Sequence, residues 1–349
     1  MAIDLSVVQG NYFQDLLSQP VALNDTLENL KETKELVKLG TRLQKGKFKA
    51  VVLTGMGSSF HGLNPLMLQL TEAGLPVAHV ETSELIHYRQ RLLTENSLVV
   101  AVSQSGRSVE TLRLLDVNRG RATLVAVTNT PDSPLAKRSD ATVFTKASEE
   151  FSVSCKTYVS TLFALKFLGD QLCRTPFART HKELTAGLLP VAQYLGSWQA
   201  HVEFLLPKLS GVRQLFLVGR GPSLAAVGTG ALILKESTQY PAEGLSSAAF
   251  RHGPFEMLGP TSFILVFAGA PKTRELNQRL LDDIREQQGR AEIVDEGDGS
   301  NALGLPKVTP SILPVLEILP VEMMTLALAA IAGREPGRFR LASKITTTE

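Results

Sequence analysis

The chain has 349 residues, enough for one large domain or two ordinary ones. Hydrophobic residues make up 44% and charged residues 20%, a balance that supports a sizeable core and excludes disorder as the dominant state. The net charge of +2, without long runs of one sign, gives no general attraction to nucleic acid or to an anionic membrane. Two cysteines are too few for a disulfide framework or a cysteine-based zinc site.

No secretory signal and no membrane span are expected. The first residues lack a basic region followed by a cleavable apolar stretch. The most apolar stretch, residues 311–333, contains two prolines and two glutamates, so we interpret it as a buried helix. The sequence therefore predicts a soluble, cytoplasmic protein with neither a nucleic-acid nor a membrane partner.

Short apolar runs alternate with helical patterns along the first half of the chain. Residues 13–45 are expected to be helical, with a break at Pro20. The runs 49–54, 97–102 and 123–128 follow, each leading into a turn and then a helical stretch. Buried strands separated by helices are typical of a parallel sheet covered on both faces.

The second half repeats the first. The glycine turn of residues 55–59 follows the first apolar run, and a matching turn at 219–223 lies 164 residues later. The run 262–267 matches the run 97–102 at nearly the same spacing. A repeat of this length indicates two copies of one α/β unit, so we predict an α/β fold of two tandem, doubly wound parallel-sheet subdomains with flanking helices. Helices are expected between the copies, in residues 174–207.

A polar loop follows the second strand of the first copy. It reads Ser-Gln-Ser-Gly-Arg-Ser over residues 103–108, and a helix is predicted from Val109. Backbone N–H groups and the helix dipole would face an anion there. The candidate anion ligands are Ser59, Ser103, Gln104, Ser105 and Ser108.

An ordinary helix cap and turn would use the same residue types. The second copy, however, reads Ala-Gly-Ala-Pro over residues 268–271 and has lost these donors. Ligands bind at the carboxyl edge of open α/β sheets, so this asymmetry favours one anion site per chain, in the first copy.

The sequence predicts neither a cofactor nor a metal. Gly55 and Gly57 alone are weak evidence for a dinucleotide site, because no third glycine follows at the required place. Glu81 or Glu84 could contact a ribose, but neither clearly ends the next strand. The dinucleotide interpretation is therefore not favoured.

Three further residues are ambiguous from the pattern alone. Glu236 lies near the end of a predicted helix, where apolar neighbours would suit a general base. A solvated glutamate paired with a cation such as Lys235 fits the same pattern. His252 lies in a turn and Lys344 in an irregular tail, where exposed residues without a catalytic role are common.

An ordered set of motifs carries a resemblance to a known family. The motifs are Gln19-Pro20, Gly57-Ser58-Ser59, Ser103-Gln104-Ser105-Gly106, Gly221, Lys235-Glu236, Ala242-Glu243-Gly244, Phe250-Arg251-His252-Gly253-Pro254 and Leu341-Ala342-Ser343-Lys344-Ile345-Thr346. Together they resemble the sugar isomerase (SIS) family, and most closely the isomerase half of glucosamine-6-phosphate synthase and its stand-alone relatives.

The resemblance implies a role for each candidate residue. The five anion ligands named above would hold the 6-phosphate of a sugar. Glu236 would move a proton between C1 and C2 of the open-chain sugar. His252 would help to open the ring from the partner subunit, which implies a homodimer. Lys344 would lie in a C-terminal lid and form a Schiff base with the ketose carbonyl.

Two departures from the family pattern bear on the substrate. The amidotransferase half is absent from the sequence, so glutamine-dependent synthesis is not expected unless a separate partner supplies ammonia. Ile233 replaces a lysine that the synthase has one helical turn before its glutamate. Loss of that cation should raise the pKa of Glu236.

We therefore expect a phosphosugar isomerase or deaminase that acts on an amino-sugar 6-phosphate. The alternatives are a fructosamine-phosphate deglycase and a sugar-phosphate sensor without catalysis. The expected segments are an N-terminal helical segment 1–48, a phosphosugar-binding SIS subdomain 49–175, connecting helices 176–207, a second SIS subdomain 208–333 and a lid tail 334–349.

Overall fold

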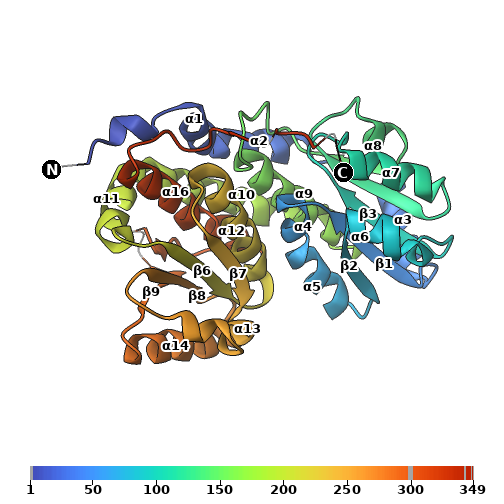
Figure 1. The fold of residues 1–349 in the computed structure, drawn as a ribbon. Coiled ribbons are helices and arrows are strands. Elements are labelled where there is room, and N and C mark those ends of the chain that lie inside the picture. Colours follow the sequence, from blue (N-terminus) through green and yellow to red (C-terminus); the bar gives the residue numbers. More distant parts are fainter. Residues whose placement is uncertain (1–2, 298–301, 342, 347, 349) are drawn as a thin grey trace. The chain divides into compact units, whose positions relative to one another are not determined.

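The structure is a computed structural model that describes residues 3–297, 302–341, 343–346 and 348 (Figure 1). Contacts divide the chain into two compact units, which we name after the first strand of each sheet, β1 (Ala50–Gly55) and β6 (Gln214–Gly219). The β1 unit comprises Val21–Glu149, Lys156–Thr185 and Ala342–Glu349. The β6 unit comprises Met1–Pro20, Glu150–Cys155 and Ala186–Leu341. The segment boundaries predicted from the sequence stay a prediction.

The β1 unit contains a five-stranded parallel sheet with the order β2-β1-β3-β4-β5. The other strands are β2 (Val77–Glu81), β3 (Ser97–Val102), β4 (Thr123–Thr128) and β5 (Ala141–Phe144). All six residues of β3 are buried. Such continuous burial requires cover on both faces of the sheet, and it explains why the apolar runs predicted these strands.

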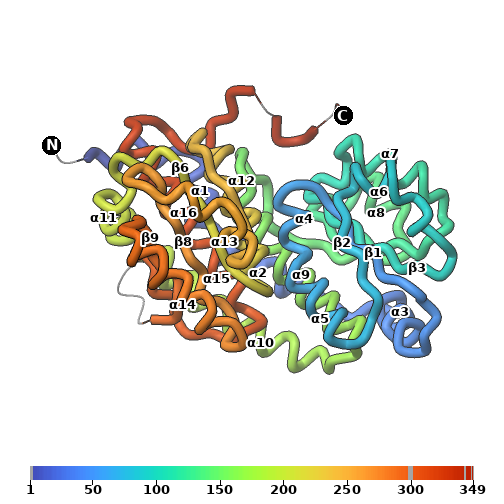
Figure 2. The backbone as a smooth tube through the Cα atoms, turned by 60° about the horizontal axis from the view of Figure 1, so that its bottom comes forward, coloured from blue at the N-terminus to red at the C-terminus, as the bar shows by residue number. Residues whose placement is uncertain are grey.

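Two groups of helices cover this sheet. The helices are α2 (Gln19–Asn29), α3 (Lys34–Gln44), α4 (Ser58–Gly62), α5 (Asn64–Glu72), α6 (Thr82–Tyr88), η2 (Gln90–Leu92), α7 (Val109–Asn118), α8 (Pro134–Lys137), α9 (Lys156–Leu172) and the first part of α10 (Phe177–Gly196). Leu85 of α6, Leu114 of α7 and Leu135 of α8 share one core with Val52 and Val99 of the sheet. Helix α9 packs with α3, α4 and α5, and Figure 2 shows this group apart from α6, α7 and α8.

The β6 unit repeats the same topology. Its parallel sheet has the order β10-β9-β8-β6-β7, with β7 (Ala242–Ser246), β8 (Ser262–Phe267), β9 (Arg290–Glu296) and β10 (Gly304–Leu305). Taken along the chain, the strands of each copy occupy the same places. The predicted α/β fold of two tandem parallel-sheet subdomains is thereby confirmed.

The helices of the β6 unit come from both ends of its sequence. They are η1 (Leu5–Val8), α1 (Asn11–Leu17), the remainder of α10, α11 (Trp198–Leu209), η3 (Gly221–Ser223), α12 (Leu224–Thr238), α13 (Ser247–Arg251), η4 (Pro254–Met257), α14 (Pro271–Glu286), α15 (Leu313–Glu317) and α16 (Leu319–Ile331). Phe216 and Ile264 of the sheet pack with Leu280 of α14. A separate group forms where α16 packs with α11 and α12.

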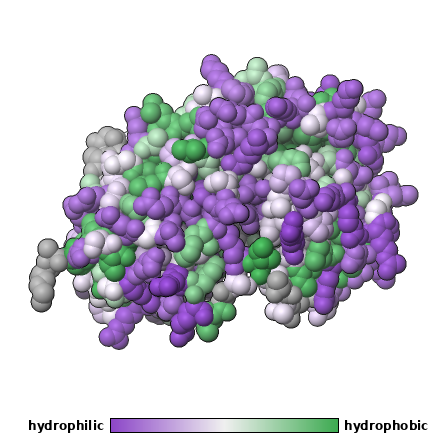
Figure 3. Space-filling view, turned by 90° about the horizontal axis from the view of Figure 1, so that it is seen from above, coloured by the Kyte–Doolittle hydropathy of each residue, from purple (hydrophilic) through white to green (hydrophobic). Residues whose placement is uncertain are grey.

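The most apolar stretch forms the core of the β6 unit. Leu313–Ile331 is long and apolar enough to cross a membrane by composition, but 94% of its most apolar window is buried inside the structure. The predicted buried helix is confirmed, as α15 and α16. Some large apolar side chains remain exposed, such as Val21 and Leu189. On the face drawn in Figure 3, hydrophobic and hydrophilic residues are intermingled.

Candidate functional site

Two loops meet at the carboxyl edge of the β1-unit sheet. Strand β1 leads into α4, and β3 leads into residues 103–108, which we call the cradle loop, and then into α7. The strands are neighbours, with Thr54 opposite Ala101, so their carboxyl ends lie side by side. The structure therefore brings together the two loops that carry all five predicted anion ligands.

The turn after β1 depends on glycine. A Cβ atom on Gly55 would lie 3.0 Å from the carbonyl carbon of Ser59 and 3.1 Å from its Cβ. Gly57, the residue before α4, has φ 53°, a conformation that side chains disfavour. These two glycines let α4 begin directly at the end of the strand, which places Ser59 at the sheet edge.

Serine hydroxyls shape the cradle loop itself. Ser103 Oγ accepts from the Gly106 N–H (3.1 Å), and Ser105 Oγ accepts from the Arg107 N–H (3.2 Å). Ser108 is the N-cap of α7, where its Oγ accepts from the Thr111 N–H. Ser103 and Ser105 are half-buried, and neither hydroxyl donates a hydrogen bond to a residue that the structure describes, so both are suited to bind an anion.

The turn after β4 holds the backbone of the cradle loop in place. The Gln104 carbonyl accepts from the Asn129 N–H (3.0 Å), from Thr128 Oγ1 (3.1 Å) and from Thr130 Oγ1 (3.4 Å). Thr128 is almost fully buried. Three donors on one carbonyl pre-organise the loop, a role that the sequence pattern did not predict for this turn.

The C-terminal tail reaches the start of α7. The Val109 N–H, one of the groups at the positive end of the helix, donates to the Thr346 carbonyl (3.2 Å). Lys344 is half-buried and lies two residues earlier, in the same unit as the cradle loop. The structure therefore brings the segment that contains Lys344 to the predicted phosphate site.

Glu236 and His252 belong to the β6 unit. Glu236 is half-buried in the last turn of α12, and Ile233, one turn earlier, is fully buried among apolar residues. His252 is exposed at the end of α13. Arg251 forms an ion pair with Asp283. The convergence of Glu236 and His252 with the cradle loop stays a prediction.

In the second copy, the buried carboxyl group of Glu317 lies at the equivalent edge of the β6-unit sheet. Ser223, which matches Ser59 in the repeat, donates to Oε1 of Glu317 (2.7 Å). Glu317 is 1% exposed, and burial raises its pKa to about 7 although the Ser223 hydrogen bond lowers it. A Cβ atom on Gly269 would lie 2.8 Å from Ser223 Oγ, so the loop after β8 packs directly on this pair. Glu317 was not predicted as a site residue; a carboxylate in the most apolar stretch was the available signal.

A second buried carboxyl group holds the Gln19-Pro20 motif. Gln19 Nε2 donates to Glu322 Oε2 (2.7 Å), and both residues are fully buried. Burial raises the pKa of Glu322 to about 8, against the lowering effect of the Gln19 hydrogen bond. Nearby, the Tyr12 hydroxyl lies 3.2 Å from Thr325 Oγ1. The motif therefore attaches the N-terminal segment to α16 within the β6 unit.

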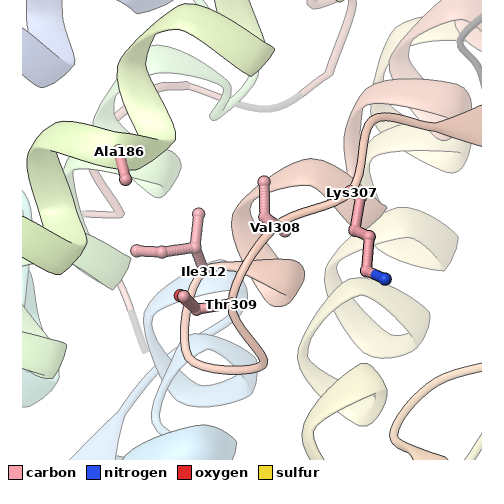
Figure 4. Close-up of a pocket in the computed structure, with 5 residues that line it drawn as sticks. All are labelled: Ala186, Lys307, Val308, Thr309 and Ile312. Atoms are coloured by element: carbon pink, nitrogen blue, oxygen red, sulfur yellow. The ribbon is translucent and has the colours of Figure 1, made fainter.

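A cavity of about 350 Å³ in the β6 unit is lined by none of the predicted site residues. Its lining is Ala186, Lys307, Val308, Thr309 and Ile312. Figure 4 shows that the Lys307 amino group points away from the apolar side chains of this hollow. Within the described ranges, no three His, Cys, Asp or Glu side chains form a group able to hold a metal ion.

Comparison with known proteins agrees with this geometry. The model of the SIS domain family matches residues 47–169, which contain the sheet, both loops and α7. Residues 47–169 therefore resemble a SIS domain. The resemblance inferred from the sequence motifs is thereby confirmed.

The chain is similar over most of its length to larger enzymes. It is 28% identical to the glutamine–fructose-6-phosphate aminotransferase (isomerizing) of Pyrococcus horikoshii, over 96% of this chain and 57% of that protein. The enzyme of the same name from Tropheryma whipplei is also 28% identical, over 100% of this chain and 60% of that protein. The chain therefore spans about 60% of the length of these relatives.

Solved structures show the same fold. The C-terminal domain of glucosamine-fructose-6-phosphate aminotransferase from Francisella tularensis superposes with a TM-score of 0.83, at 21% identity, covering 97% of this chain and all of that domain. A phosphosugar isomerase, described as putative, from Silicibacter pomeroyi superposes with a TM-score of 0.76, at 26% identity, covering 93% of this chain and 99% of the other.

Proposed function

We propose that the chain is a phosphosugar isomerase that converts an amino-sugar 6-phosphate, such as glucosamine 6-phosphate, to a ketose 6-phosphate with release of ammonia. The cradle loop carries this proposal, because its hydroxyls and the N-terminus of α7 form a site for a phosphate group. The proposal is supported by the relatives, whose names include an isomerizing activity on fructose 6-phosphate. A glucosamine-6-phosphate deaminase of Thermotoga maritima shares the fold, with a TM-score of 0.77.

Phosphate binding anchors the substrate at one end. Ser103 and Ser105 donate their free hydroxyl protons to the phosphate oxygens, and Ser59 donates from the neighbouring loop. The Gln104 amide and Ser108 complete the site. An anchored phosphate holds the open-chain sugar in one orientation, so that C1 and C2 are presented to the reacting groups.

Proton transfer follows ring opening, which His252 assists. Glu236 takes the proton from C2 of the open-chain amino aldehyde and returns it to C1. The C1 oxygen meanwhile takes up a proton given up by the C2 ammonium group, so that the aldehyde becomes a hydroxymethyl group and the ammonium becomes an iminium ion. Attack by the Lys344 amine at C2 expels ammonia and leaves a Schiff base between Lys344 and C2. Water then hydrolyses that bond, so that one water is consumed and one ammonia is released for each ketose phosphate formed.

Proton NMR in D2O tests the reaction directly. With glucosamine 6-phosphate we expect the C2 proton signal to disappear while ketose phosphate forms, and Glu236→Gln should slow both by about 100-fold or more, the usual contribution of general acid–base catalysis. Turnover that is unchanged in Glu236→Gln overturns the mechanism. Binding of sugar phosphates without any turnover indicates the sensor instead, and turnover of a fructosamine phosphate alone indicates the deglycase.

The proposed homodimer can be tested by mixing two inactive variants. His252 is exposed at the end of α13, as expected for a residue that serves a partner's site. If each site takes Glu236 from one chain and His252 from the other, unfolding and refolding Glu236→Gln with His252→Ala restores about a quarter of wild-type activity, because half the dimers are mixed and each has one intact site. No recovery in dimers shown to be mixed overturns the shared site.

A further inference from the structure

Arg107 is held inside the proposed phosphate site by its own backbone. It is the one charged residue in the sequence of the cradle loop. Its N–H donates to Ser105 Oγ (3.2 Å), and the next residue, Ser108, is the N-cap of α7. The preceding residue, Gly106, has φ 59°, and a Cβ there would lie 2.6 Å from Ser133 Cβ. The position of Arg107 between two proposed phosphate ligands is therefore fixed by the fold of the loop.

The guanidinium of Arg107 has no partner in the described part of the chain. The side chain is exposed and forms neither an ion pair nor a hydrogen bond with described residues. Glu110, in the first turn of α7, is 7% exposed, and its Oε2 also lacks a hydrogen-bond partner, yet the two residues form no ion pair. At the other end of α7, by contrast, Arg121 donates to the Val117 carbonyl.

An unpaired cation at this end of a helix is electrostatically unfavourable. The N-terminus of α7 carries a partial positive charge, and cations are preferred at the opposite end. The tail adds Lys344 to the same neighbourhood through the Val109–Thr346 hydrogen bond. A bound dianion would pair with the Arg107 guanidinium at this end of the helix and offset its unfavourable charge.

Lysine and arginine have different roles in such a site. Lys344 must lose its proton before it attacks C2, so its amine is neutral in that step. An arginine keeps its charge throughout and offers two parallel N–H donors to phosphate oxygens. Arg107 is therefore the group that maintains a positive charge beside the phosphate in every step.

We infer that Arg107 is the specificity-determining residue that selects doubly charged sugar phosphates, by pairing its guanidinium with the phosphate held by Ser105 and Ser108. This inference rests on the proposed function, because it takes the cradle loop to be the phosphate site. Arg107 would thus be a charged ligand beside the serine hydroxyls, and its contribution to the binding free energy would depend on the charge of the substrate.

The test compares Arg107→Gln, Arg107→Lys and the control Arg121→Gln, which removes the same charge from the other end of α7. Calorimetry measures binding of fructose 6-phosphate and glucosamine 6-phosphate, and kinetics separate KM from kcat. For Arg107→Gln we expect both Kd and KM to rise by about tenfold and kcat to change by less than about threefold, as expected for one partly exposed charged contact. Arg107→Lys should recover part of the loss, and Arg121→Gln should bind as the wild type does.

Added salt provides a second readout that does not depend on turnover. The wild-type Kd should rise with ionic strength, and this slope should be shallower in Arg107→Gln, because an exposed charged contact is screened by salt. An unchanged Kd in Arg107→Gln overturns the inference while the proposed function stands. A fall in kcat with unchanged KM also overturns it. If the wild type binds neither sugar phosphate, the proposed function fails, and the inference fails with it.

Discussion

Ser59 and Ser223 occupy the same place in the two copies of the repeat, but they differ in what they bind. Each follows a glycine turn after the first strand of its sheet, and each packs against the glycine that ends that strand. Ser223 donates to the buried carboxyl group of Glu317. The Ser59 hydroxyl forms no hydrogen bond with the residues that the structure describes, and Ser59 is half-buried at its sheet edge. Each serine is thus placed to donate to an oxygen acceptor. Among the described residues, the β6 unit provides such an acceptor, Glu317, and the β1 unit provides none for Ser59.

The loops after the second strands differ in the same sense. The cradle loop offers hydroxyls, whereas Ala268 and Ala270 offer none, and Gly269 packs on the Ser223–Glu317 pair. The Asn277 side-chain amide donates to the carbonyls of Phe267 and Ala268. The polar groups at the edge of the β6-unit sheet therefore bond to one another, whereas the edge of the β1-unit sheet offers hydroxyl donors to a ligand.

The strongest test makes the first edge resemble the second. Replacing Ser103 and Ser105 together by alanine should weaken binding of glucosamine 6-phosphate by at least about 100-fold, because each hydrogen bond to a charged group contributes about 1.5–3 kcal/mol. Calorimetry measures the affinity, and thermal unfolding checks that the fold is kept. The matched control, Ala268→Ser, should leave affinity unchanged. Equal affinity in the double variant would show that the loop is not the phosphate site.

The second test removes the internal carboxyl group. Because the pKa of Glu317 is raised from 4.5 to about 7, its contribution to stability is complete below pH 4.5 and is lost as the pH rises through 7. The loss approaches about 3 kcal/mol at high pH, so Glu317→Gln should flatten the pH dependence of the free energy of unfolding by about that amount. Denaturant unfolding between pH 5 and 9 measures it.

Two features sharpen this test. Glu322, whose pKa is raised to about 8, should continue to lower stability above pH 7 in Glu317→Gln. The exposed Glu286, at the end of α14, provides the matched control Glu286→Gln, which removes a carboxylate from the surface instead of from the core. A Glu317→Gln profile parallel to that of the wild type would contradict the buried, raised-pKa carboxyl group.

The two serines should respond oppositely to the same change. Ser59→Ala should weaken sugar-phosphate binding by about tenfold, the effect of one hydrogen bond to a charged group, with little change in stability. Ser223→Ala should leave binding unchanged but lower the free energy of unfolding by about 1–3 kcal/mol, because Glu317 loses its donor while remaining buried. The proposed contrast between the two edges fails if both variants lose only stability.

The smallest effect concerns the turn that anchors the cradle loop. Thr128→Val keeps the shape of the side chain but removes one of three donors to the Gln104 carbonyl. A loss of about 1 kcal/mol should raise KM about fivefold without an equal fall in kcat, because the loop positions the phosphate and not the reacting carbons. Thr130→Val, which removes a longer hydrogen bond, should give a smaller change in KM.

Local patterns in the sequence were enough to predict the fold. The apolar run 97–102 is typical of a strand covered on both faces, and it is fully buried as β3. The glycine turns at 55–59 and 219–223 indicated the duplication through their matching residues. Polar residues at the end of a buried strand must face the carboxyl edge, so the same reasoning located the cradle loop.

Such local patterns did not predict hydrogen bonds between residues that lie far apart in the sequence. The apolar stretch that contains Glu317 indicated a buried helix, but not that its carboxyl group meets Ser223, 94 residues earlier. The contact between Val109 and Thr346 likewise joins residues that no periodicity relates. Hydrogen bonds of this kind depend on how elements pack, which the sequence specifies only through the complete fold.

The ends of the chain are exchanged between the two copies of the repeat. The N-terminal segment Met1–Pro20 groups with the β6 unit, and the C-terminal segment Ala342–Glu349 groups with the β1 unit. Tyr12 and Leu16 are fully buried there, so a gene fragment that encodes only the first copy would expose apolar side chains that have lost their core. We therefore expect that the first copy does not fold on its own. The two copies share one strand order, but a cut between the two sheets would separate each unit from the terminal segment that packs with it.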